Sequence, residues 1–161
     1  MPRVLAPILK TLVFTIVVPG FIAVWVPHQL ARPISKPPLD AMTIIGCLLT
    51  TLGAAAYLTT AWNFAYHGLG TPAILDPPKT LIARGLHRYV RNPMYVSVLL
   101  MVLGQAALFR AWPLLIYAAC LWLVFHLFVL FYEEPTLQKK FGASYEQYRS
   151  SVPRWLPRLE S

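Results

Sequence analysis

The residues of this chain best suited to chemistry lie in two polar clusters. The first is a basic and aromatic stretch at residues 85–95, with the sequence GLHRYVRNPMY. The second is a pair of adjacent carboxylates, Glu133 and Glu134, at the end of a long apolar run. Only 12% of the residues are charged, so clusters at the two edges of one apolar region suggest a shared polar site at a membrane surface.

The carboxylate pair suits a ligand that carries amino and hydroxyl groups. A carboxylate next to hydrocarbon costs about 2–3 kcal/mol at the bilayer centre and less near the interface, so such a residue usually has a function. Neighbouring side chains on a helix point about 100° apart, so one ligand contacts both Glu133 and Glu134 only by wrapping the helix end. The structural alternative is a helix-end carboxylate that pairs with Arg88 or Arg91.

The basic stretch could bind an anion. Pro93 disfavours helical backbone at Asn92, so a helix is predicted to begin near Pro93, and free N–H groups at a helix start form an anion site. In the alternative interpretation, Arg88 and Arg91 only fix the orientation of the protein in the membrane.

The aromatic residues and the histidine of this stretch also allow two interpretations. Tyr89 and Tyr95 could be interfacial belt aromatics or the walls of a pocket. His87 could be a histidine with a structural role at the interface or a base.

The elements that carry the two clusters are predicted to be membrane-spanning helices. The chain has 161 residues, of which 57% are hydrophobic, and its mean hydropathy of +0.56 is unlike that of a soluble domain. About 20 apolar residues span a bilayer core. Four segments approach that length, at residues 5–26, 41–66, 94–109 and 111–132. We therefore expect an all-α, polytopic membrane protein with about four transmembrane helices.

The third and fourth predicted spans form a tight helical hairpin. Arg110 alone separates them, or residues 110–113 do if the helix ends fray. Pro113 suits the first turn of the second helix because its missing N–H would have no partner there.

Beyond Tyr132 the pattern changes to that of an amphipathic helix on the cytoplasmic face. Its apolar stripe consists of Leu137, Phe141, Tyr145 and Tyr148. We expect this helix to be broken or bent at Gly142. Pro135 cannot donate to the carbonyl of Phe131, so a kink is expected where the fourth span leaves the membrane.

The distribution of lysine and arginine predicts the orientation. One side would hold ten of these residues: Arg3, Lys79, Arg84, Arg88, Arg91, Lys139, Lys140, Arg149, Arg154 and Arg158. The other side would hold three: Arg32, Lys36 and Arg110. This bias places the termini and the basic stretch in the cytoplasm. The net charge of +8 is then a topology and anionic-headgroup signal, and we expect no nucleic-acid partner.

Two further features bear on processing and metal binding. Arg3 precedes an apolar stretch without a small-x-small cleavage site, which favours an uncleaved anchor. Cys47 and Cys120 lie within predicted spans and lack the spacing of a metal site, so neither a disulfide nor a metal is expected.

The clusters and their neighbours form an ordered series that resembles the signature of a known family. In order, the series is residues 79–82, Gly85, residues 91–95, Glu133 and Glu134, Phe141 and Gly142, Tyr145, Tyr148, and Val152 and Pro153. It resembles the integral-membrane methyltransferases typified by isoprenylcysteine carboxyl methyltransferase and the phospholipid N-methyltransferases. Their shared signature is Arg-His-Pro-x-Tyr-x-Gly, a variable gap, and Glu-Glu. The resemblance covers residues 79–157, and the N-terminal half matches only as generic membrane helices.

The resemblance implies an S-adenosylmethionine site at the cytosolic face. The residues it places in the cofactor pocket are Lys79, Thr80, Leu81, Ile82, His87, Asn92, Pro93, Met94 and Tyr95, with Glu133 and Glu134 holding cofactor amino or hydroxyl groups. His87, Arg91 and Tyr95 are the candidates for catalytic roles. Of these, His87 and Tyr95 are expected mainly as pocket residues and only secondarily as proton acceptors.

The implied acceptor is lipophilic or small and reaches the site from the bilayer: an isoprenylcysteine carboxylate, a lipid amine or a thiol. We expect one membrane domain over residues 1–161, with two spans in 1–66 and the cofactor-binding catalytic part in 67–161. The expected location is a multi-pass position in the bacterial inner membrane, with the active site cytoplasmic. The sequence does not indicate an oligomeric state.

Three positions depart from the family pattern. The signature histidine is replaced by Asn92 and the signature glycine by Ser97. In the prenylcysteine enzymes an arginine four residues before the first glutamate recognises the substrate carboxylate, and here this residue is Val129. The last departure argues against prenylcysteine carboxyl methylation.

Two other classes of function remain open at this point. One is a membrane reductase related to the sterol reductases, which would bind a nicotinamide cofactor. The other is a small membrane scaffold without enzymatic activity, whose basic loop binds anionic lipid.

Overall fold

The computed structural model describes residues 12–31, 37–67, 81 and 83–157 and is helical throughout its regular elements. Residues 12–20 are helical and continue directly into the next two elements. The elements are the π-helical turn η1 (Phe21–Trp25), α2 (Val26–Ala31), α3 (Ala41–His67), the 3₁₀ turn η2 (Gly85–Arg88), α4 (Pro93–Phe109), α5 (Trp112–Phe128), the π-helical turn η3 (Val129–Glu133), α6 (Glu134–Phe141) and α7 (Ala143–Ser151). The all-α prediction is confirmed.

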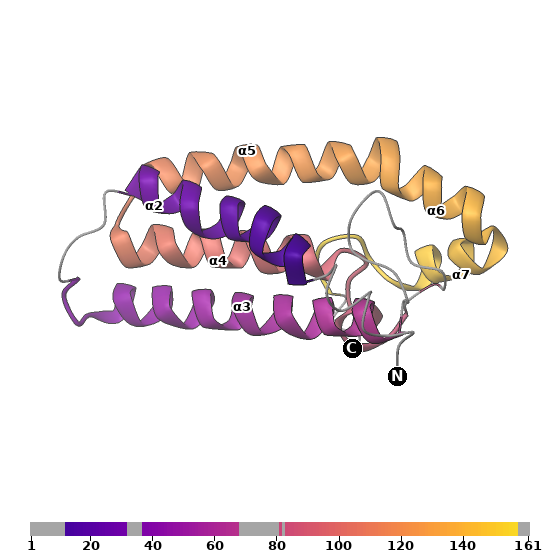
Figure 1. Cartoon of the computed structure of the whole chain (residues 1–161), viewed down its shortest axis with the longest axis horizontal. Helices are drawn as coiled ribbons and strands as arrows, with labels where there is room; N and C mark the ends of the chain where they lie inside the picture. Colours follow the sequence, from indigo (N-terminus) through magenta and orange to yellow (C-terminus); the bar gives the residue numbers. More distant parts are fainter. Residues whose placement is uncertain (1–11, 32–36, 68–80, 82, 158–161) are drawn as a thin grey trace.

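The apolar helices form an elongated bundle. Figure 1 shows α3, α4 and α5 running along its length, with the helix Leu12–Ala31 inclined across them. Three helices are long and apolar enough to cross a membrane: Leu12–Ala31, Ala41–Asn63 and Trp112–Phe141. The fourth, α4, is equally apolar but has 17 residues, fewer than the roughly 20 that span a bilayer core.

The turn between α4 and α5 is as tight as predicted. Arg110 adopts the left-handed conformation with φ 49°, and its N–H donates to the carbonyls of Ala106 and Ala107. Pro113 lies in the first turn of α5. The side chain of Arg110 also pairs with Asp40, which precedes α3, so this end of the bundle is closed by an ion pair.

Glycines allow α3 and α4 to pack with their backbones in contact. A methyl group on Gly46 would lie 2.8 Å from the carbonyl oxygen of Gly104, and one on Gly53 would lie 2.8 Å from the carbonyl oxygen of Ser97. Small residues at such crossings are typical of membrane helices, where close van der Waals packing takes the place of the hydrophobic effect. Ser97, which replaces the glycine of the signature that the sequence resembles, is buried and donates to the carbonyl of Pro93, so its hydroxyl is satisfied within α4.

Gly104→Ala is therefore expected to lower the melting temperature of the detergent-solubilised protein. The added methyl would lie 2.6 Å from the backbone nitrogen of Thr50, and α3 must move to accommodate it, at a cost of roughly 1–3 kcal/mol. Gly20→Ala is the matched control, because the nearest atom outside its own helical turn is 3.7 Å away. Equal melting temperatures for the two variants would contradict the close packing of α3 against α4.

Side chains from two helices hold the N-terminal helix at its π-helical turn. Gln105 donates to the carbonyl of Ala23 (2.6 Å) and Tyr117 donates to the carbonyl of Ile22 (2.9 Å). A π-turn leaves carbonyl groups without their usual partners in the helix, and α4 and α5 supply the missing donors.

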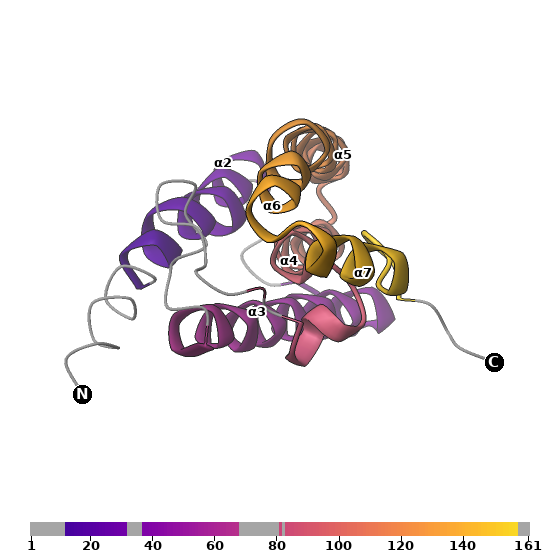
Figure 2. The same ribbon diagram turned by 90° about the vertical axis from the view of Figure 1, so that its right-hand side faces the viewer.

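The end of the last span bends at the predicted place. Pro135 lies in the first turn of α6, directly after the π-helical turn η3, and α6 leaves the line of α5 in Figure 1. Gly142, with φ 53°, separates α6 from α7. Figure 2, which views the bundle from this end, shows α7 in front of α4, and Figure 1 shows α7 beyond the end of α4. Tyr145 of α7 is only 2% exposed. The predicted break at Gly142 is confirmed.

Candidate functional site

The two polar clusters of the sequence meet at the end of the bundle. Three pieces of chain come together there: the start of α4, the junction of η3 with α6, and residues 152–155 after α7. We call residues 152–155 the C-terminal strap.

Glu134 is the centre of an ion-pair network. Its Oε1 accepts from Nη1 of Arg91 (2.9 Å) and from Nε of Arg154 (2.7 Å), and its Oε2 accepts from Nη2 of Arg154 (3.0 Å). The side chains of Glu134 and Arg91 are 10% and 11% exposed. Both oxygens of Glu134 are therefore occupied by guanidinium groups, and Arg91 is the partner that the structural alternative named.

Glu133 has a different environment from its neighbour. Its Oε2 accepts a hydrogen bond from the hydroxyl of Tyr95 (3.0 Å). Within the described part of the chain it forms no ion pair with lysine or arginine. The two glutamates thus diverge, as their 100° separation on a helix requires.

The C-terminal strap is tied to the basic stretch by backbone and amide groups. The backbone N–H of Arg91 donates to the carbonyl of Pro153 (2.9 Å), and Nδ2 of Asn92 donates to the carbonyl of Arg154 (3.2 Å). Asn92 is 7% exposed. Asn92, which replaces the signature histidine, is therefore a buried residue that holds the C-terminal strap against the start of α4.

An aromatic layer covers Tyr95 on the side of α5. The ring of Tyr95 lies 4.6 Å from that of Phe125 and 6.4 Å from that of Trp155. Nε1 of Trp155 donates to Nδ1 of His126 (3.1 Å), and the ring of Trp122 stacks on His126. The strap thereby packs against α5 and restricts the position of Tyr95.

His87 is buried in the η2 turn, with 6% exposure. Its backbone carbonyl accepts from the hydroxyl of Tyr148 in α7 (2.7 Å), which links η2 to the C-terminal helices. Burial lowers the pKa of the His87 imidazole to about 4. The side chain is therefore neutral at pH 7.

This lowered pKa predicts a loss of stability in acid. The folded protein protonates His87 only near pH 4, whereas the unfolded chain does so near 6.5, so the unfolded state binds more protons in between. Stability should fall by up to about 3 kcal/mol as the pH falls from 6.5 to 4. Melting temperatures across this range should show a shallower decline for His87→Gln than for the unsubstituted protein. His28→Gln, at an exposed position, should keep the full decline, and equal declines in all three proteins would contradict the assignment.

The structure brings together most of the residues singled out by the sequence. Those at the meeting point are Arg91, Asn92, Tyr95, Glu133 and Glu134. Pro93 begins α4, and Met94 packs against the core of the bundle. Leu81 is half-buried, while Lys79, Thr80 and Ile82 lie outside the described residues. Within the described ranges no three histidine, cysteine, aspartate or glutamate residues form a group suited to a metal ion.

Sequence reasoning missed five residues around the site: Trp122, Phe125, His126, Arg154 and Trp155. Their roles depend on contacts with elements distant in the chain, as when Arg154 reaches Glu134. The available signal was Val152 and Pro153, the last members of the ordered series, which directly precede Arg154.

Two comparisons with known proteins bear on this arrangement. The model of a family described as phospholipid methyltransferase matches residues 41–144, which include both glutamates and the whole basic stretch. The chain is also similar to the protein-S-isoprenylcysteine O-methyltransferase of Schizosaccharomyces pombe, with 38% identity over 78 residues. That alignment covers 48% of this chain and 33% of the yeast protein.

Proposed function

Because the chain belongs to the phospholipid methyltransferase family, we propose that it is an S-adenosylmethionine-dependent methyltransferase of the membrane. Its acceptor would be lipophilic or small. The yeast relative supports a methyl-transfer activity, and the three long apolar helices support an integral membrane location.

Glu133 is the observation that carries this proposal. A carboxylate at the end of a membrane helix is costly unless a cation or several donors satisfy it. Among the described residues, its hydrogen-bond partner is the hydroxyl of Tyr95, which leaves acceptor capacity for a ligand. S-adenosylmethionine offers an ammonium group and ribose hydroxyls, so the site fits this cofactor.

The neighbouring basic side chain offers a complementary contact. Nε of Arg91 is buried and has no hydrogen-bond partner in the described part of the chain, although Nη1 is held by Glu134. A guanidinium N–H of this kind suits the carboxylate of an amino-acid moiety. Arg91 and Glu133 would thus recognise the two charges of that moiety, and the family resemblance adds His87, Asn92, Pro93 and Met94 to the pocket.

When bound, the cofactor supplies an electrophilic methyl group. The residues of the chain then have to position the acceptor and exclude water. Tyr95 holds Glu133 through its hydroxyl, while Phe125 and Trp155 cover the Tyr95 ring on one side. Burial keeps His87 neutral at pH 7 and lowers its pKa to about 4, which makes it a weak base, so His87 is proposed as a pocket residue and not as the proton acceptor.

The acceptor is proposed to be a lipid amine or a thiol in preference to a prenylcysteine carboxylate. Val129, at the position where the prenylcysteine enzymes have arginine, is 1% exposed in the η3 turn. An apolar side chain there offers no cation to a carboxylate. We further propose that the site faces the cytoplasm, on the basis of the ten-to-three distribution of lysine and arginine.

A methyl-transfer assay tests this proposal. The purified protein in lipid nanodiscs is incubated with S-adenosylmethionine that carries a labelled methyl group. Three parallel reactions contain phosphatidylethanolamine, a prenylated thiol or a small alkyl thiol as the acceptor. We expect label in the amine or the alkyl thiol and, at a cofactor concentration below saturation, several-fold less label with Glu133→Gln. Transfer to none of the acceptors, or equal transfer by the variant, would contradict the proposal.

A further inference from the structure

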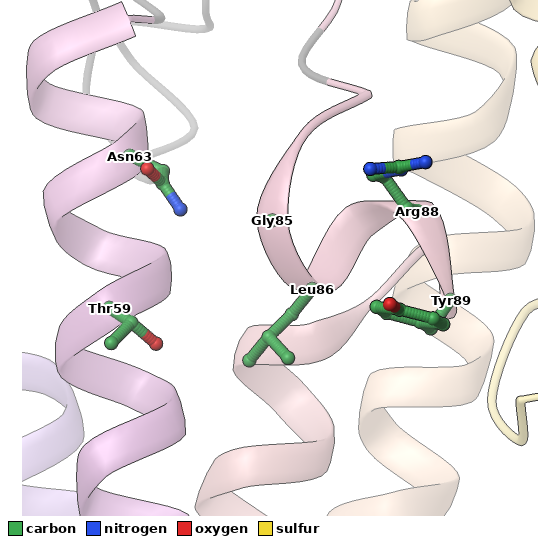
Figure 3. Close-up of a pocket in the computed structure, with 6 residues that line it drawn as sticks. All are labelled: Thr59, Asn63, Gly85, Leu86, Arg88 and Tyr89. Carbon is green, nitrogen blue, oxygen red and sulfur yellow. The ribbon is translucent and has the colours of Figure 1, made fainter.

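A pocket with polar groups in its lining lies between α3 and the η2 turn. Thr59 and Asn63 point into it from α3, and Figure 3 shows the η2 turn opposite them. The six lining residues are Thr59, Asn63, Gly85, Leu86, Arg88 and Tyr89. They include a guanidinium, an amide and two hydroxyl groups but no carboxylate, so the pocket is chemically suited to an anion.

The pocket has a fixed wall and an available cation. Gly85 has φ +58°, and a methyl group on it would lie 2.7 Å from Nδ2 of Asn63, so this amide lies directly against the turn. Arg88 is exposed and forms no ion pair within the described residues. Tyr89 is 60% exposed. An exposed arginine and tyrosine at the end of a membrane helix are at the level where lipid headgroups lie.

An apolar stripe leads along α3 to this pocket. Ile45, Leu48 and Leu52 precede Thr59 and Asn63 at spacings of 3, 4, 7 and 4 residues, which place all five on one helix face. The three apolar side chains are 52%, 56% and 60% exposed. This face of α3 therefore presents apolar side chains along the span and hydrogen-bond donors at its end. A phospholipid has the matching arrangement, with acyl chains followed by a polar headgroup.

The pocket shares the η2 turn, which also carries His87, with the candidate methyl-transfer site, but none of its lining residues is among those assigned to that site. Figure 2 shows α3 and η2 on one side of α4, and α6 on the other. Glu133, at the start of α6, contacts Tyr95 and none of the lining residues in the contacts described.

We infer that this pocket binds the phosphate of an anionic glycerophospholipid that stays with the protein and is not methylated. Arg88 and Asn63 contact the phosphate, Tyr89 lies at the level of the glycerol backbone, and an acyl chain packs along Ile45, Leu48 and Leu52. The inference does not depend on the proposed enzymatic activity, because it concerns binding at another place on the surface.

Lipid binding to the full-length protein tests the inference. The probe is dioleoylphosphatidylglycerol, titrated calorimetrically into delipidated protein in a mild non-ionic detergent. Arg88→Gln should weaken binding about fivefold or more, since one arginine near a phosphate contributes about 1 kcal/mol. Arg84→Gln is the matched control: Arg84 is an exposed arginine of the same turn region but does not line the pocket. Its affinity should stay within twofold of the unsubstituted protein.

Each outcome decides the inference. An equal loss in both variants would mean that general surface charge attracts the lipid, and no loss in Arg88→Gln would mean that the pocket is not involved. Either of these two results overturns the assignment of the pocket to a phospholipid. A second titration uses soluble glycerol phosphate, which lacks acyl chains and should bind at least tenfold more weakly than the lipid. Equal affinities would show a site for free phosphate esters and overturn the lipid assignment.

The inference and the proposed function fail separately. Titration of the same samples with S-adenosylmethionine should give equal affinities for the unsubstituted protein and for Arg88→Gln. A lipid-binding defect with normal cofactor binding is the pattern expected of two separate sites, whereas a parallel loss of both would overturn the second site.

Discussion

Replacing Glu133 with glutamine is expected to weaken S-adenosylmethionine binding at least tenfold without lowering the melting temperature. Glutamine keeps an oxygen that can accept from the Tyr95 hydroxyl but loses the charge that attracts an ammonium group. A hydrogen bond to a charged group contributes about 1.5–3 kcal/mol, which corresponds to a tenfold or larger change in affinity. Isothermal titration calorimetry of the detergent-solubilised protein measures the dissociation constant for S-adenosylmethionine.

The control for this variant is Glu146→Gln. Glu146 is an exposed glutamate of α7 that pairs with Arg149, so its replacement changes the net charge equally but should leave cofactor affinity unchanged. If Glu133→Gln bound S-adenosylmethionine as tightly as the control, Glu133 would have only a structural role at the helix end.

Glu134→Gln is expected to have the opposite effect and destabilise the fold by about 3 kcal/mol or more. Removing one partner of a buried ion pair leaves the other charge uncompensated, at a cost of roughly 3–5 kcal/mol. Here Arg91, with its side chain 11% exposed, would lose its counter-ion, and Arg154 would lose its anchor. A thermal melt of the solubilised protein should show a clearly lowered transition temperature.

Glu146→Gln again provides the comparison, since exposed pairs contribute only about 0–1 kcal/mol. An equal, small change for Glu134→Gln and Glu146→Gln would mean that the Glu134 network is as weak as a surface pair. Together the two substitutions separate the adjacent carboxylates into one that contacts the ligand and one that holds the C-terminal strap.

Local rules predicted the helix boundaries from α4 onward well, whereas the first span, expected to end at residue 26, continues to Ala31. Pro93 and Pro113 mark the starts of α4 and α5, Arg110 forms the turn between them, and Gly142 separates α6 from α7. These positions depend on the backbone conformations that single residues allow, and the identity of each residue is enough to predict them. The π-helical turns were not predicted, because their freed carbonyls need donors such as Gln105 and Tyr117 from distant helices.

The candidate site could be predicted in its location but not in its pairings. The sequence left both Arg88 and Arg91 as partners for a glutamate, and the fold selects Arg91 together with the unforeseen Arg154. That choice depends on how the strap packs against α4, which involves Asn92 and residues far along the chain. Periodicity and spacing describe single elements and carry no such long-range information.

A cofactor titration followed by thermal melting tests the central claim most directly. The claim is that this membrane protein binds S-adenosylmethionine as a methyltransferase. S-adenosylmethionine and S-adenosylhomocysteine should each raise the melting temperature of the purified protein in a concentration-dependent way, because a ligand that binds only the folded state stabilises it. A reduced nicotinamide cofactor should leave it unchanged. Stabilisation by the nicotinamide and by neither adenosyl compound would contradict the account and favour a membrane reductase.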